Sequence, residues 1–215
     1  MNKNSNLLLA LDISTSCIGI ALFEDKGDAG DLILLHHVSP KIKPKPENKT
    51  EELFKKVEIF EEEFLTKYIN FGINRVVIEE PLLQSNNVYT IATLLRFNGM
   101  ISKSVYEKLG VIPDFISSYD ARKYSYPDLM AVRKFKKDGT PLPEKQIAKN
   151  EPVLFGAYPF DVDKKTVIWN KVSEEYPLIE WFYDKNMKLK KECYDMSDAV
   201  ACGLGYMGMT GRWKR

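Results

Sequence analysis

The feature that most constrains the fold is a pair of apolar runs near the start of the chain, separated by a Ser/Thr turn. Residues 7–23 read LLLALDISTSCIGIALF. The first run is too short for a helix and ends in turn formers, so the stretch predicts two adjacent strands of a hairpin. Asp12 stands inside the first of them. A buried carboxylate is costly unless its charge is compensated, although a lone aspartate here would more often belong to the turn.

Hydrophobic periodicity predicts an α/β order for the rest of the chain, with a mixed five-stranded sheet flanked by helices in one domain. Residues 128–163 hold prolines at 141, 143, 152 and 159 and an Asp138-Gly139 turn signal, which indicates an insertion without long regular elements. The segment 179–187 is compatible with helix or strand. The further strands are expected at 32–38, 75–79 and 111–116. The helices are expected at 50–68, from Ser85 or Asn87 to 110, and at 119–126, 164–175 and 195–209.

Three more acids are candidates to lie close to Asp12 in the folded chain. Glu79 ends an apolar strand, and Asp195 and Asp198 lie three apart in the last expected helix, where they share a face. Acids that open a helix can simply favour its dipole, which is the structural alternative for this pair. Two like charges at this spacing repel, however, and a divalent cation reverses that effect.

Four converging carboxylates without a histidine suit two magnesium ions, with manganese as a substitute. Such a pair activates water and stabilises the leaving oxygen in phosphodiester hydrolysis. The two histidines, His36 and His37, are adjacent in an expected strand, so they should face opposite sides and serve structure. Glu80 should point away from Glu79 if the strand continues through both residues, which favours a surface position.

Composition excludes some classes of protein and leaves nucleic-acid binding open. The net charge is +1, but basic residues cluster at 41–45, 133–137, 185–191 and 212–215, and a basic face can bind phosphates. Three cysteines without CxxC spacing indicate neither a disulfide framework nor a zinc site. No apolar run approaches the ~20 residues of a membrane span and no signal-peptide core opens the chain, so we expect a cytoplasmic protein with no membrane partner.

Three short motifs, in order, resemble those of the RuvC family of Holliday-junction resolvases. They are LALDISTSCIGIA at 9–21, VIEEP at 77–81 and YDMSDAVA at 194–201. The expected helix 88–109 sits where that family has a helix involved in dimer contacts. The family often carries an aromatic residue three positions after its glutamate, and here that position holds Leu82. The size and the insertion are more similar to a phage or viral relative than to a compact bacterial enzyme.

The resemblance implies a ribonuclease H-like fold, a homodimer and magnesium-dependent nicking of four-way DNA junctions. It assigns metal binding and catalysis to Asp12, Glu79, Asp195 and Asp198. It also assigns DNA contacts to four basic residues, Arg122, Lys123, Lys164 and Lys165. In a bacterium, or in the host of a phage, the setting would be the cytoplasm.

Three other functions remain open at this point. A RuvC-like nuclease could instead cut flaps or forks, and the Leu82 departure keeps this alternative open. A junction-binding module without catalysis would not need all four acids. The DISTS turn also resembles the first phosphate loop of actin-like proteins and sugar kinases, but we find no second phosphate loop and no adenosine motif.

Overall fold

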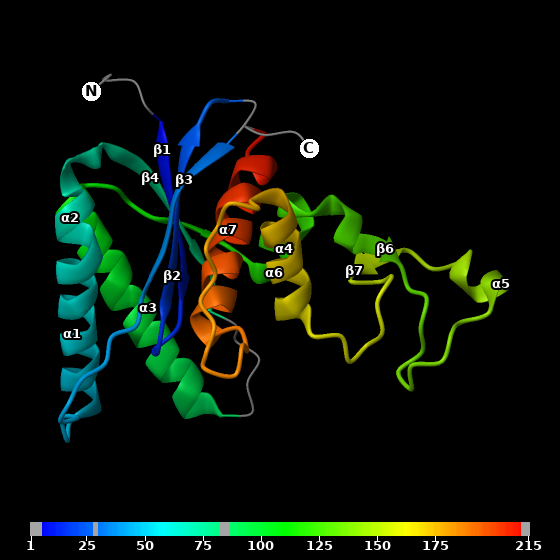
Figure 1. Cartoon of the computed structure of the whole chain (residues 1–215), viewed down its shortest axis with the longest axis horizontal. Coiled ribbons are helices and arrows are strands. Elements are labelled where there is room, and N and C mark those ends of the chain that lie inside the picture. The colour runs from blue at the N-terminus through cyan, green and yellow to red at the C-terminus, as the bar shows by residue number, and fades with distance from the viewer. Residues whose placement is uncertain (1–5, 28–29, 82–86, 212–215) are drawn as a thin grey trace.

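A five-stranded mixed sheet forms the centre of the molecule in the computed structural model, which describes residues 6–27, 30–81 and 87–211 (Figure 1). The strand order is β3-β2-β1-β4-β5. Neighbours β3, β2 and β1 are antiparallel, whereas β4 and β5 run parallel to β1. This confirms the predicted fold class. The strands are β1 (Leu7–Ile13), β2 (Ile18–Asp25), β3 (Gly30–Val38), β4 (Ile73–Glu79) and β5 (Asp114–Ile116).

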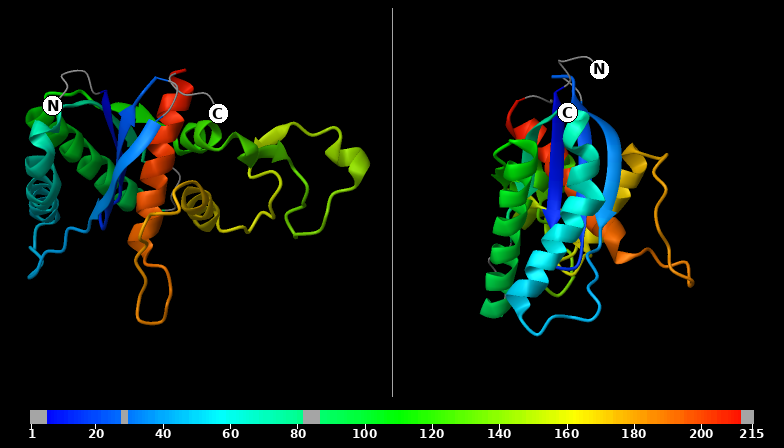
Figure 2. Two further views of the ribbon diagram at one scale, coloured as in Figure 1. Left: turned by 45° about the horizontal axis from the view of Figure 1, so that its top comes forward. Right: turned by 90° about the vertical axis from the view of Figure 1, so that its left-hand side faces the viewer.

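Helices cover both faces of the sheet, as two further views show (Figure 2). One face carries α1 (Lys49–Phe60), which continues through a π-helical turn (Glu61–Leu65) into α2 (Thr66–Tyr68) and a 3₁₀ turn (Ile69–Phe71), and α3 (Val88–Leu109). The other face carries α4 (Ser118–Ser125), α6 (Lys164–Glu175) and α7 (Lys191–Met209). Among the described residues, no helix is long and apolar enough to cross a membrane.

Side-chain alternation along β1 divides the core in two. Leu9 and Leu11 pack with α1 and α3, whereas Leu8 and Ala10 pack with α4, α6 and α7. Successive strand residues point to opposite faces, so both faces of a central strand must be apolar when helices cover each of them. The same alternation directs the next residue of the second set, Asp12, toward the α7 face.

Two helices begin directly after an asparagine whose side chain caps them. The Asn48 side chain accepts hydrogen bonds from the backbone of Thr50 and Glu51, and Asn87 caps α3 in the same way. Gly110 ends α3 with a φ of 70°, a left-handed conformation that glycine adopts without a Cβ penalty. The predicted start of α1 is confirmed to within one residue, and of the two starts considered for α3, Asn87 is adjacent to the observed first residue, Val88.

Several predicted boundaries were wrong for local reasons. Helix α7 begins at Lys191 rather than Asp195. The strand expected at 111–116 covers only Asp114–Ile116, because Pro113 cannot donate to a ladder. The segment 179–187 is neither helix nor strand, since Asp184 accepts bonds from the backbone of Asn186 and Lys188 and closes a turn. On α3, Leu95 is exposed, whereas Phe97 is buried in the core.

Residues 130–154 project from the body of the molecule (Figure 1). They contain a two-stranded antiparallel sheet of β6 (Met130–Val132) and β7 (Pro152–Leu154), which follows a 3₁₀ turn (Pro127–Leu129). Helix α5 (Glu144–Ile147) lies between the two strands. The predicted Asp138-Gly139 turn is confirmed by a hydrogen bond from the Lys136 amide to the Thr140 carbonyl. That 128–163 is an insertion into an ancestral fold stays a prediction.

Candidate active site

Two of the predicted acids stand side by side at the ends of parallel strands. The register that pairs Leu11 of β1 with Ile78 of β4 brings the next residues, Asp12 and Glu79, beside each other. Asp12 follows the alternation of Ala10, and Glu79 that of Val77; both apolar residues pack in the α7 core. The two carboxylates therefore face α7 at the carboxyl edge of the sheet.

Glycines let α7 approach that edge closely. A Cβ on Gly203 would lie 2.4 Å from the ring of Phe23, so the helix rests directly on β2. Gly19, also on β2, is the strand partner of Asp12 on β1. It faces the backbone of α7, where a Cβ on Gly19 would lie 2.0 Å from the Asp195 carbonyl oxygen. This contact fixes the height of Asp195 and Asp198 above the strand ends. The four acids thus come from β1, β4 and α7 to one place.

The position of the α7 acids within the helix removes the alternative offered by the helix dipole. With Lys191 as the first residue of α7, Asp195 is the fifth and Asp198 the eighth, and the acid of the first turn is Glu192. The dipole effect falls off within the first turn. The helix dipole therefore stabilises neither aspartate, and Asp198 is buried without that compensation.

Two cations compensate the α7 acids. The Lys165 ammonium of α6 lies 3.0 Å from Asp195 Oδ1 and 3.5 Å from Asp198 Oδ2. The Arg122 guanidinium of α4 lies 3.3 Å from Asp198 Oδ1. The Asp198 side chain is only 4% exposed and that of Arg122 15%, whereas Lys165 is half exposed. The Arg122 side chain is thus packed inside the site, whereas the Lys165 side chain extends into it from the protein surface.

Burial and crowding raise the pKa values of the two strand acids. Burial raises the pKa of Asp12 well above its usual range, and the charges of Glu79, Asp198 and Asp195 add to the effect. Burial also raises the pKa of Glu79 to about 7, with a further rise from Asp198, while Arg122 and Lys165 oppose it. Perturbed carboxyls of this kind cluster at functional sites because like charges converge there.

The donor chemistry of this site fits a hard divalent cation. The donors are carboxylate oxygens without histidine or thiolate among them, which magnesium and manganese prefer. Burial and the neighbouring carboxylates together raise the pKa values of Asp12 and Glu79, and a bound cation would favour their ionised forms. Within the described residues, however, no three acidic, histidine or cysteine side chains are already arranged around a single point as metal ligands. Lys165 and Arg122 hold two of the carboxylates instead.

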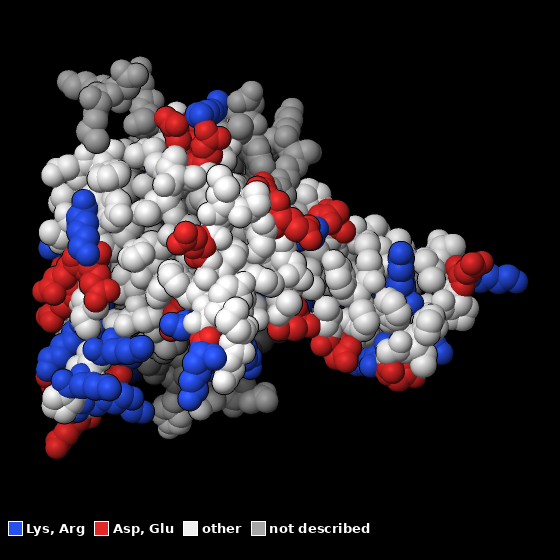
Figure 3. Space-filling model, in the orientation of Figure 1, with Lys and Arg blue, Asp and Glu red and all other residues white. Residues whose placement is uncertain are grey.

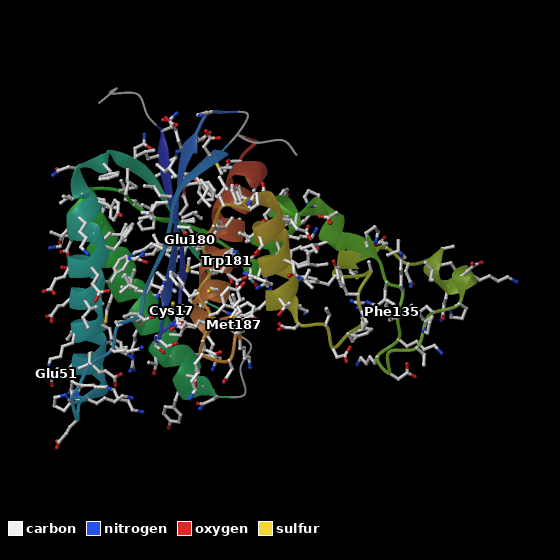
Figure 4. The ribbon with its side chains drawn as sticks, viewed as in Figure 1. Cys17, Glu51, Phe135, Glu180, Trp181 and Met187 are labelled. Carbon is white, nitrogen blue, oxygen red and sulfur yellow. The ribbon has the colours of Figure 1, made fainter. Side chains whose placement is uncertain are left out.

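An open groove of about 670 Å³ lies beside the site and reaches it at Asp195. The β1–β2 turn forms one wall with Ser14 and Cys17, and Lys165 and Asp195 line the other side. Cys17 marks this end of the sheet in Figure 4. The Ser14 hydroxyl accepts from the Cys17 amide at 3.0 Å, and Lys56 of α1 donates to the Thr15 carbonyl at 2.9 Å. The turn is therefore fixed, and of the four acids Asp195 lines the groove directly.

The remaining predicted residues lie around the site in different settings. Lys123 extends over the Tyr124 ring and Lys164 over the Phe155 ring, so neither shares the ion pairs of Arg122 and Lys165. Strand β4 ends at Glu79, and Glu80 is exposed beyond it, with its amide bonded to Ile116. The prediction about Leu82 lies outside the described residues.

Sequence reasoning missed Gly19 and the partners of the α7 acids. A glycine inside an apolar strand is a recognised sign of close backbone approach, so Gly19 carried a signal that could have been used. Arg122 and Lys165 were assigned to DNA, whereas the structure pairs both with acids of the site. Nothing local in the sequence indicates that pairing.

Comparison with known proteins shows the fold. No protein-family model and no curated protein sequence matches the chain. Among solved structures, Thermus thermophilus RuvC matches with a TM-score of 0.52 and 14% identity, over 95% of each chain. T. thermophilus RuvC in complex with a Holliday junction substrate gives 0.54 and 13%, over 95% of this chain and 94% of that one. The fowlpox virus Holliday junction resolvase gives 0.41 and 13%, over 94% and 97%. The chain has the ribonuclease H-like fold of the RuvC structures.

Proposed function

We propose that the chain is a metal-dependent endonuclease that makes paired nicks in branched DNA, with the four-way junction as its substrate. The observation that carries this proposal is the convergence of Asp12, Glu79, Asp195 and Asp198 from three elements, close enough for their charges to act on one another. An open groove reaches this site at Asp195. The fold is also that of a RuvC structure solved with a Holliday junction substrate. An ATP-binding function receives no comparable support.

In this proposal the four acids hold two magnesium ions, which manganese can replace. Asp12 would contribute to both ions, with Glu79 on one and the Asp195/Asp198 pair on the other. When bound, such ions activate water for attack on a phosphate and stabilise the leaving oxygen. Because the donors are all carboxylates, each must lose its proton before it can ligate an ion.

The basic residues of the site have a positioning role in this proposal. Arg122 is almost buried and contacts Asp198 from α4, so it holds that carboxylate in place. Lys165 is half exposed and contacts both α7 acids, so its ammonium can turn toward a DNA phosphate in the groove when a cation takes over the carboxylates. Ser14 and its turn set the width of the groove on the other side.

A homodimer would present two such sites to one junction. Helix α3 supports this part of the proposal because large apolar residues recur along one exposed face. Val88 is 75% exposed, Leu95 46% and Tyr106 53%. Their spacing of seven and eleven residues keeps them near one helix face, and exposed apolar patches of this kind mark protein interaction sites.

A nuclease for flaps or forks is the second candidate. The observation that favours it is Leu82, which stands where the resembled family often has an aromatic residue near the junction centre. This alternative keeps the metal site and changes only the shape of the DNA that is cut.

The test compares cleavage of a mobile four-way junction with cleavage of matched duplex, flap and fork substrates in magnesium and in manganese. Asp12→Asn and Glu79→Gln should abolish cleavage while DNA binding persists. Glu80→Gln is the matched control, because Glu80 is exposed beyond the strand, and it should retain cleavage.

Paired, symmetric nicks on the junction alone would support the resolvase. Cleavage of flaps or forks but not of junctions would move the function to the second candidate. Cleavage of no substrate in either metal would overturn the nuclease and leave a binding module or an ATP-binding protein, which an ATP titration separates.

A further inference from the structure

The projecting segment carries a charge opposite to that of the remaining chain. We define the basic arm as residues 133–149, which hold six Lys or Arg residues and two acids. The arm is therefore +4 in a chain of net charge +1, and the other 198 residues together carry −3. Figure 3 shows basic side chains distributed along the arm as far as its tip. This segregation concentrates positive potential on one extension of a slightly acidic body.

The arm lysines are free to bind a partner. Five of them, Lys134, Lys136, Lys137, Lys145 and Lys149, are exposed. Within the described residues none of the five forms an ion pair, whereas Lys55 and Lys103 on the body pair with acids one helical turn away. The large apolar side chains of the arm, Phe135, Leu142 and Ile147, are not exposed. The arm thus lacks the apolar anchors typical of a protein interface and offers charge instead.

The base of the arm is fixed to the core. Leu129 and Phe155, which flank it, are buried, and the Phe155 amide donates to the Leu129 carbonyl at 2.8 Å. A Cβ on Gly156 would lie 1.8 Å from the Ala131 carbonyl oxygen, so the two chain segments touch backbone to backbone there. The Arg133 guanidinium stacks on the Phe160 ring at 4.0 Å. The arm therefore has a defined direction from the body.

The arm also joins the two elements that contribute cations to the candidate active site. Helix α4, with Arg122, precedes it, and helix α6, with Lys165, follows it. In Figure 1 the chain returns from β7 along the lower edge to the lower end of α6. This end is the N-terminal end of the helix, and Lys165 is its second residue. Figure 4 marks Phe135 on the arm, well to one side of Cys17 beside the acids. A rod-like partner on the arm could thus extend to the groove.

We propose that the basic arm binds the phosphate backbone of duplex DNA outside the cleavage site, along one arm of a branched substrate. This inference rests on the proposed function for the nature of the partner. A stiff polyanion fits a series of lysines without apolar anchors, because backbone contacts need positive charge and no base recognition. The arm contributes affinity and orientation, and the four acids remain responsible for cleavage.

The experiment measures binding separately from cleavage. Wild-type protein, Lys134→Gln/Lys136→Gln/Lys137→Gln and a control, Lys26→Gln/Lys55→Gln/Lys67→Gln, are titrated with a fluorescent junction and a duplex in EDTA at several KCl concentrations. Both triple variants lose three charges from exposed lysines, so net charge alone cannot separate them. Unfolding temperatures of all three proteins should agree closely, since none of these lysines is buried and the exposed ion pairs of Lys26 and Lys55 contribute little to stability.

We expect the arm variant to bind both DNAs several-fold more weakly at every salt concentration. The slope of log K against log[salt] should become shallower by about 1 for each DNA phosphate that the variant no longer neutralises. Cleavage at saturating protein in magnesium should keep its position on the junction.

Equal affinity and equal slope for wild type and arm variant would overturn the role of the arm and leave the nuclease untouched. An equal loss in both triple variants would also overturn it, because the effect would then follow net charge. Arm-dependent binding without cleavage would instead support the arm while the proposed function failed. Wild-type protein that bound neither DNA would overturn both.

As an independent readout, Lys145→Cys can be labelled with a fluorophore, because the three native cysteines are buried. DNA should change the emission of this label and not that of a label at Lys55→Cys. An unchanged emission at residue 145 with bound DNA would place the duplex elsewhere and overturn the proposal.

Discussion

Gly19 and Asp195 meet backbone to backbone: the space of the missing Cβ on Gly19 is filled by the Asp195 carbonyl group, with 2.0 Å to its oxygen. Gly19 pairs with Asp12 across the β1–β2 ladder. The strand acid and the helix acid are therefore brought together by one residue that itself carries no functional group. A larger residue at position 19 would have to move α7 or bend β2.

Gly19→Ala should consequently lower stability and cleavage together. Overpacking of a tight core typically costs about 1–3 kcal/mol, and the displaced α7 would carry Asp195 and Asp198 away from Asp12. Urea unfolding measures the first effect, and junction cleavage at saturating magnesium measures the second. Gly99→Ala is the control: nothing lies within 4 Å of a Cβ on that α3 glycine, so its unfolding free energy should stay equal or rise by up to about 1 kcal/mol. A fully active, fully stable Gly19→Ala protein would contradict this account of the site.

Removal of the Lys165 ammonium should make the site bind metal more tightly. In the metal-free protein this ammonium lies within 3.5 Å of both α7 carboxylates and competes with any other cation for them. Lys165→Gln should therefore raise the Mn²⁺ affinity several-fold in calorimetric titrations at a pH of about 8.5, above the folded pKa of Glu79. The metal-free protein should lose roughly 1 kcal/mol of stability at most, since Lys165 is half exposed. Lys164→Gln, which removes a neighbouring charge without these contacts, should match wild type in both measurements. Equal Mn²⁺ affinity in the two variants would contradict the competition.

Glu79 should make the metal-free protein less stable as the pH rises. Its folded pKa of about 7 lies above the value of 4.5 for an unperturbed glutamate. Between these values the folded state binds more protons than the unfolded state, so the free energy of unfolding falls as the pH rises through this window. Glu79→Gln removes this dependence. In EDTA, the stability of Glu79→Gln relative to wild type should increase by about 1–3 kcal/mol across this window and then level off.

Glu80→Gln is the matched control for this measurement, because Glu80 is exposed beyond the strand. Its stability relative to wild type should stay flat over the same pH range. Excess magnesium should raise the stability of wild-type protein above the folded pKa of Glu79 more than that of Glu79→Gln, because the ion favours the ionised carboxylate. If the difference in unfolding free energy between Glu79→Gln and wild type did not change with pH, the burial of a crowded carboxyl at this position would be contradicted.

The sheet and the four acids could be predicted from the sequence because their signals are local. Apolar alternation identifies β1 and β4, and short motifs mark Asp12, Glu79 and the Asp195/Asp198 pair. The start of α7 could not be predicted in the same way. Its N-cap, Lys190, makes no side-chain capping bond, so no Ser, Thr, Asp or Asn marks the first turn.

The electrostatic partners of the site needed the tertiary structure. Arg122 is 76 residues from Asp198 in the chain, and Lys165 is 30 residues from Asp195. The sequence alone shows only that these residues are basic. A family resemblance can suggest that they contact DNA, but it does not show which acids they contact in the folded chain. The direction of the basic arm depends likewise on contacts at its base, such as that of Gly156 with Ala131.

The exposed face of α3 should mediate a homodimer. Leu95 lies on that face with Val88 and Tyr106, and it is 46% exposed in the isolated chain. Leu95→Lys would place a charge in the centre of an apolar interface, where an unpaired charge is strongly unfavourable. Light scattering coupled to size-exclusion chromatography should give a dimer for wild type and a monomer for this variant, with an unchanged circular dichroism spectrum. Leu178→Lys is the control, because Leu178 is 95% exposed and lies outside α3; it should remain a dimer. The monomer should nick single strands of a junction without pairing the cuts, and a wild-type monomer at micromolar concentration would exclude this interface.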